Sequence, residues 1–152
     1  MLTTSISELI PILQTAIGPV ILISGVGLLI LSMTNRLGRA IDRARSLAGK
    51  YPQAASEFQP AMLEQIKTIW RRAKILRVAI ALASLSVLLA AILIISLFLT
   101  ALFHLEIAWL VSVVFIGCLG SLIGAMIAFL YDMQLSLEAL RVEMEKDTGS
   151  RF

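Results

Sequence analysis

Charged residues are absent from three long stretches of this sequence, Leu9 to Asn35, Val78 to Phe103 and Ile107 to Tyr131. Each stretch is predominantly apolar and 25 to 27 residues long. A helix needs about 20 residues to cross a hydrocarbon core of roughly 30 Å, so each stretch predicts one transmembrane helix. Proton-coupled transporters and pumps usually carry an ionisable side chain inside the membrane, so its absence argues against coupled transport.

Cysteine and histidine are each represented once, by Cys118 and His104. One cysteine excludes an intramolecular disulfide. One histidine, in the turn between the second and third stretches, gives neither a catalytic triad nor a histidine-rich metal site. The sequence also lacks a glycine-rich turn between a strand and a helix that could bind phosphate. We therefore expect no enzyme activity, no catalytic residues, no cofactor and no metal.

Hydrophobic residues, by contrast, make up 59% of the 152 residues, and charged residues only 15%. A soluble domain of this size could not bury so much apolar surface. We predict an all-α membrane protein with one membrane domain over residues 1–152. Its transmembrane helices are expected at about 9–35, 78–103 and 107–131. The first stretch has no basic residue before Arg36, which favours a retained helix over a cleaved signal peptide.

Basic residues predict the orientation. Residues 36–77 hold ten Lys and Arg against three acids, a net charge of +7. Under the positive-inside rule this segment is cytoplasmic, which leaves the N-terminus outside and the C-terminus in the cytoplasm. The positive charge is explained by the membrane surface, so we expect no nucleic-acid partner.

The three transmembrane helices are predicted to extend into a cytoplasmic helical bundle. Residues 36–77 form a helical hairpin with a loop near 49–60, and the third helix continues over about 132–147. The continuation keeps an apolar stripe with alternating spacings of three and four, while Asp132 and later acids occupy its other faces. We favour the hairpin of the same chain as the partner of this stripe; self-association as a coiled coil is the alternative. The stripe comprises Ile116, Leu119, Ile123, Met126, Leu130, Met133, Leu137, Leu140 and Met144.

Small residues form ridges on the second and third helices. Such ridges allow helix backbones to approach closely in lipid. Packing within one chain accounts for most of them, but together they offer more close-packing surface than three helices use, so we expect a homo-oligomer. The third helix carries Gly120, Gly124 and Ala128 on one ridge and Gly117, Ser121 and Ala125 on another; the second helix carries Ala79, Ala83, Ser86 and Ala90.

One face of the first helix changes from small and polar residues to arginines. At 100° per residue, seven residues fall within roughly a 60° sector, which we call the glycine–arginine sector. They are Gln14, Gly18, Gly25, Ser32, Arg36, Arg39 and Arg43. The sector could line a pore with a ring of arginines. Two alternatives are favoured over a pore: a packing face, or arginines that bind anionic lipid headgroups, each contributing about 1 kcal/mol.

Two segments resemble a bacterial membrane family catalogued only as a domain of unknown function. The resemblance rests on Gly18-Pro19, on Asn35-Arg36-Leu37-Gly38-Arg39 with Asp42-Arg43, and on Trp70-Arg71-Arg72-Ala73 with Leu76-Arg77. It covers nearly the whole chain and implies a three-span protein of the bacterial inner membrane. It implies no activity, substrate or catalytic residue.

Two hypotheses about function follow. The chain is a self-associating protein of the inner membrane that forms a small oligomeric ion channel lined by the first helix. Alternatively, it is a non-conducting scaffold or accessory subunit that binds anionic lipid headgroups or a membrane partner.

Overall fold

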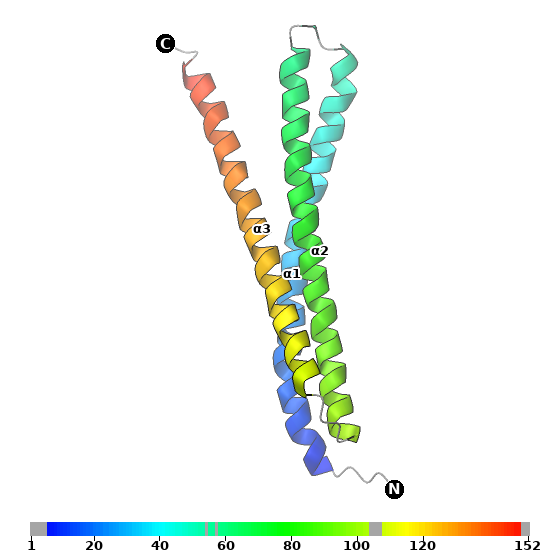
Figure 1. Ribbon diagram of the computed structural model, residues 1–152. Helices are drawn as coiled ribbons and strands as arrows, with labels where there is room; N and C mark the ends of the chain where they lie inside the picture. Colours follow the sequence, from blue (N-terminus) through cyan, green and yellow to red (C-terminus); the bar gives the residue numbers. More distant parts are fainter. Residues whose placement is uncertain (1–5, 54, 57, 104–107, 150–152) are drawn as a thin grey trace. The chain divides into compact units, whose positions relative to one another are not determined.

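The computed structural model describes residues 6–53, 55–56, 58–103 and 108–149, and within these ranges it describes the side chains of all but residues 6–9, 12–13, 101 and 136–149. These residues form three long helices and one short 3-10 turn (Figure 1). The helices are α1 (Ile6–Lys50), α2 (Gln59–Phe103) and α3 (Ala108–Gly149), and the 3-10 turn η1 spans Tyr51–Gln53. The described residues contain no strand.

Each helix contains a segment long and apolar enough to cross a membrane. These segments lie within Gln14–Gln53, Gln59–Thr100 and Ala108–Leu135. The predicted all-α class with three transmembrane helices is therefore confirmed. The helices also continue past their apolar stretches, because α1 runs through the arginines to Lys50 and α2 begins well before Val78.

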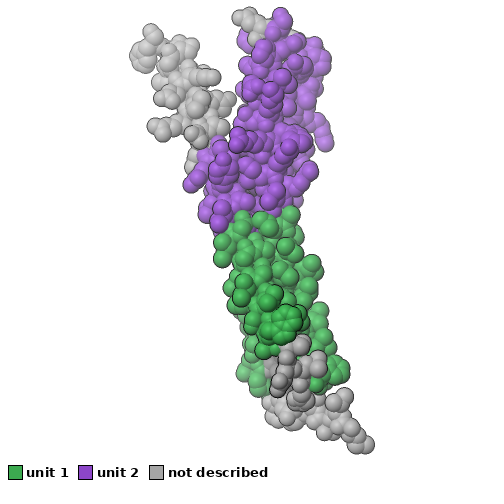
Figure 2. Space-filling view, in the orientation of Figure 1, with its two compact units in different colours: residues 1–31, 81–124 green, residues 32–80, 125–152 purple. Residues whose placement is uncertain are grey.

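The polypeptide divides into two compact units (Figure 2). Unit 1 comprises residues 1–31 and 81–124, and unit 2 comprises residues 32–80 and 125–152. Each unit contains segments of all three helices.

In unit 1, α2 and α3 meet through small side chains. Ala83, Ser86 and Ala90 of α2 are buried, and so is Cys118 of α3. The Cys118 thiol donates a hydrogen bond to the Ser86 carbonyl oxygen at 3.3 Å, and its sulfur lies 3.6 Å from the Ser86 hydroxyl. Small residues permit this close approach, and polar contacts between helices add to it in a lipid environment. The predicted small face of α2 is thus the buried face.

In unit 2, all three helices contribute to one apolar cluster. Met33 of α1 and Leu76 and Ala79 of α2 are buried at its centre. Leu37, Ile80, Ala128 and Phe129 pack against these three residues. Ala79 is the fourth member of the small face predicted on α2, and it is completely buried.

The repeat of α3 predicted a buried face only for its cytoplasmic part, where Met133 is the one member whose side chain the structure describes, and Met133 is exposed. Within the membrane segment, where the repeat predicted no buried face, Leu119 and Met126 are half-buried and the other members are exposed. Ile116 is 68% exposed and Ile123 60% exposed. Lipid tails are as apolar as these side chains, so facing lipid costs them nothing, and small residues occupy the helix contacts instead. Leu137, Leu140 and Met144 lie outside the described side chains.

A substitution that enlarges one residue of the small face of α2 tests whether this face is packed against the other helices. Ala83 is buried, and replacing it with leucine inserts three methylene-sized groups into this packed face, so we expect Ala83→Leu to destabilise the fold by about 1–3 kcal/mol. Ala81→Leu is the matched control, because Ala81 is exposed on the same helix. Unfolding of the purified proteins in detergent measures the difference. Equal stability of the two variants would contradict this packing.

Candidate functional site

The glycine–arginine sector lies on an uncovered face of α1. In unit 1, Gln14, Gly18 and Gly25 are exposed, and a Cβ atom built on either glycine would have no neighbouring atom within 4 Å. In unit 2, Ser32, Arg39 and Arg43 are exposed as well. Within each unit, the described residues of α2 and α3 therefore leave these positions open.

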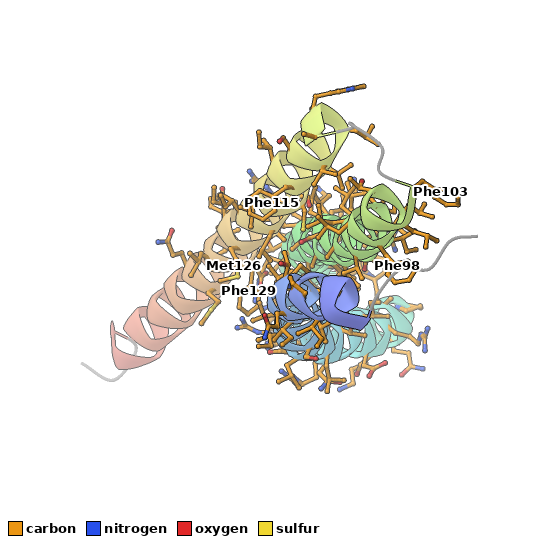
Figure 3. All side chains as sticks on the ribbon, turned by 90° about the horizontal axis from the view of Figure 1, so that it is seen from below. Phe98, Phe103, Phe115, Met126 and Phe129 are labelled. Atoms are coloured by element: carbon orange, nitrogen blue, oxygen red, sulfur yellow. The ribbon has the colours of Figure 1, made fainter. Side chains whose placement is uncertain are left out.

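Arg36 departs from the rest of the sector. It is half-buried, and its guanidinium carbon lies 5.4 Å from the centre of the Phe129 ring on α3. Phe129 is labelled in Figure 3. A guanidinium over an aromatic face is attracted by the ring's quadrupole. Arg36 consequently contributes to the packing of unit 2, and only two of the three predicted arginines remain fully on the open face.

Large apolar side chains interrupt the polar character of this face. Ile21 and Leu28 lie on or beside the sector and are 66% and 71% exposed. A face of this kind alternates glycine and small polar groups with bulky apolar ones. Around a symmetry axis, the apolar positions would form constrictions and the glycines wider sections.

The predicted packing residues of α3 separate into covered and uncovered positions. In unit 1, a Cβ on Gly117 would lie 3.5 Å from Leu89 of α2, and Ser121 is buried. A Cβ on Gly124 would lie 3.3 Å from Leu82, so α2 approaches closely there too. Gly120 is exposed, with no described atom within 4 Å of its Cβ position.

Unit 2 contains the last two predicted packing residues. Ala125 is completely buried, and Ala128 packs against the Met33 cluster. Five of the six predicted positions on α3 are therefore buried, half-buried or, at the exposed Gly117, approached by a side chain of α2. Gly120 is the one of the six with no described atom within 4 Å of its Cβ position.

A buried ion pair in unit 2 was not expected from the sequence. Asp132 of α3 is completely buried, although the pattern of α3 had placed it on an outward face. Its Oδ1 atom lies 3.5 Å from Nε of Arg72 on α2, and the Arg72 side chain is 28% exposed. The prediction for Asp132 was wrong because this residue continues the ridge of Gly120, Gly124 and Ala128 by one more helical turn. That spacing is the signal that could have located it.

The ion pair joins the two helices at the end of the third apolar stretch. A buried carboxylate must lose its hydration, and this loss is offset only by a close cation and further polar contacts. The pair therefore specifies the register of α3 against α2 in unit 2, because a shift by one residue would move Asp132 away from Arg72 and leave its charge in an apolar seam.

The described residues include no cluster of three His, Cys, Asp or Glu side chains that could hold a metal ion. His104, the single histidine of the sequence, lies outside the described residues.

The unequal burial of the two partners predicts an asymmetric double-mutant cycle. Arg72→Gln leaves a fully buried carboxylate without this guanidinium, so we expect it to destabilise by about 3 kcal/mol. Asp132→Asn should destabilise less, because the partly exposed arginine can turn toward water. The double variant should recover part of the loss. Unfolding in detergent measures all four proteins, and strictly additive effects would show that the pair is not coupled.

Comparison with known proteins places the chain in a family. A family described as a protein of unknown function (DUF2721) matches residues 16–142, which includes the glycine–arginine sector from Gly18 onward, Arg72 and Asp132. No curated protein and no solved structure matches the chain. The chain belongs to the DUF2721 family.

Proposed function

We propose that this protein is a homo-oligomer of the bacterial inner membrane in which the glycine–arginine sector of α1 faces the symmetry axis and lines a small pore. The observation that carries the proposal is the open face of α1, where Gly18 and Gly25 have no neighbouring atom within 4 Å of their Cβ positions. Helix pairs in membranes associate through such small residues, because they allow close backbone approach.

Polar groups on the same face support association over lipid exposure. Gln14 and Ser32 are exposed near the two ends of the apolar stretch of α1. An amide or hydroxyl that faces hydrocarbon lacks hydrogen-bond partners from water, and side chains of this type bond across helices instead. A second copy of α1 would provide such partners. Gly120 of α3 offers a further open position for contact between subunits.

The arginines give the proposed pore its electrostatic character. Arg39 and Arg43 are exposed and share the helical phase of Gly25. Around an axis they would form rings of positive charge that attract anions and oppose cations. Ile21 and Leu28 would supply hydrophobic constrictions on the same face.

A non-conducting scaffold is the second candidate. Arg39 and Arg43 lie four and eight residues after Asn35, the end of the apolar stretch of α1. They have no described contact with an acid, since the ion pairs present in the described part of unit 2 involve other residues. Exposed arginines at this position attract anionic lipid headgroups or an acidic membrane partner. In this arrangement the open face of α1 would serve packing alone.

The proposed orientation places residues 36–77 and the C-terminal end of the chain in the cytoplasm, with the N-terminus outside. The net charge of +7 over residues 36–77 supports this orientation under the positive-inside rule.

Subunit counting tests the oligomer. We expect the protein reconstituted in nanodiscs to contain at least three copies, and Gly25→Leu to lower that number because a leucine prevents close approach. Gly27→Leu is the matched control, since Gly27 is also exposed without neighbours but lies about 200° from Gly25 around α1. A monomer or dimer of the unaltered protein would rule out the pore.

Ion selectivity separates the two candidates. For a pore, Arg39→Glu should shift the permeability ratio of reconstituted channels from anions toward cations, because it reverses the charge of one ring. Arg45→Glu, which makes the same charge change on the opposite side of α1, should leave the ratio unchanged. Absence of any conductance in the unaltered protein, together with loss of bound anionic lipid in Arg39→Glu, would favour the scaffold.

A further inference from the structure

A second basic face lies on α2, away from both the glycine–arginine sector and the buried small face. At 100° per residue, its members fall within about 80° around the helix. All of them are exposed. The face, which we call the Trp70 face, consists of Leu63, Lys67, Trp70, Lys74 and Arg77.

Trp70 is the centre of this face. The indole is 58% exposed, and the Lys74 Nζ atom lies 4.1 Å from the centre of its ring. This cation–π contact orients the ammonium group beside the aromatic surface. The pair therefore presents an amphipathic ring and a positive charge at one point of the helix.

Charge on this part of α2 is strongly unbalanced. Residues 59–77 contain five Lys and Arg and one acid, Glu64. Glu64 accepts a hydrogen bond from Lys67 at 3.0 Å in an exposed ion pair, and Arg72 faces the buried Asp132. Lys74 and Arg77 are consequently the cations of the Trp70 face that no described carboxylate contacts within ion-pair distance.

The position of the face along the helix limits what can cover it. Arg77 is directly followed by Val78, the first residue of the second apolar stretch, and Val78 is itself 54% exposed. Trp70 lies seven residues before Arg77, a rise of about 10 Å. Since α2 enters the bilayer at Val78, the face lies at and just above the level of the lipid headgroups, where tryptophan and basic side chains are favoured.

We propose that the Trp70 face binds the phosphate of an anionic phospholipid, with Lys74 and Arg77 contacting the headgroup and the Trp70 ring packed against its glycerol and upper acyl region. The site lies on a different helix from the glycine–arginine sector. The proposal depends on the membrane placement of α2, and it stands whether or not the chains self-associate.

Tryptophan fluorescence tests the site in the full-length protein. Trp109→Phe leaves Trp70 as the single tryptophan, because the chain has two. The protein is reconstituted in phosphatidylcholine vesicles that contain a minor fraction of phosphatidylglycerol, with bromine quenchers on the acyl chains of one lipid or the other. We expect brominated phosphatidylglycerol to quench Trp70 more strongly than its mole fraction predicts.

Charge removal then tests which residues hold the lipid. Lys74→Gln with Arg77→Gln should lower the preference for phosphatidylglycerol by about fivefold per charge removed. Arg45→Gln with Lys50→Gln removes the same charge from α1 about 15 Å or more beyond Asn35 and should leave the preference unchanged. The swap Lys74→Arg with Arg77→Lys should also retain it, which separates loss of charge from loss of fold.

Inorganic phosphate distinguishes a lipid site from a general phosphate site. At constant ionic strength, replacing chloride with phosphate should not release phosphatidylglycerol from Trp70, because the acyl chains and the ring contribute to binding. The proposal would be overturned if phosphate released phosphatidylglycerol from Trp70, or if brominated phosphatidylglycerol quenched Trp70 only in proportion to its mole fraction. It would also be overturned if the α1 control variant lost the preference for phosphatidylglycerol to the same extent.

Discussion

The close contact between small side chains of α2 and the other helices is the constraint on which the rest of the structure depends. Ala79 and Leu76 in unit 2, and Ala83, Ser86 and Ala90 in unit 1, are buried along one face of this helix. In lipid, no hydrophobic effect drives helices together, so tight packing and a few polar contacts must do so. With this face of α2 occupied, the large apolar side chains on its other faces, such as Leu85, Leu88 and Ile95, are left to face lipid. The glycines of α1 and Gly120 of α3 are left without neighbours.

The close packing of α2 against the other helices also determines where charged side chains of unit 2 can lie. The one completely buried carboxylate described, Asp132, lies where a small residue would continue the α3 ridge, and Arg72 reaches it from α2. The other described Lys and Arg residues of unit 2 are exposed, apart from Arg36 over the Phe129 ring. Basic charge thus surrounds the end of the membrane segment on two separate faces. One belongs to α1 and suits a symmetry axis, whereas the other belongs to α2 and suits lipid headgroups.

Much of this fold could be predicted from hydropathy and spacing. The three helices and the small face of α2 follow directly, because length and residue size decide them locally. The spacing of the α3 ridge could have placed Asp132 in the helix contact, but its pairing with Arg72 could not be predicted in this way, since that arginine is 60 positions away in the sequence. For a related reason, the apolar repeat of α3 inside the membrane predicted no buried face: periodicity identifies a face but does not say whether protein or lipid covers it. The sequence likewise could not show that Gly18 and Gly25 are uncovered, because that depends on where α2 and α3 lie.

The central claim is that the glycine–arginine sector of α1 meets its counterpart in another copy of the chain. Oxidative cross-linking in native membranes tests it most directly, in a Cys118→Ala background that removes the only native thiol. A disulfide forms only when two cysteine Cα atoms come within about 7 Å. The account predicts cross-linked dimers for Gly25→Cys and monomers for Gly27→Cys on the opposite side of α1. Monomers for Gly25→Cys, or equal cross-linking at both positions, would contradict it.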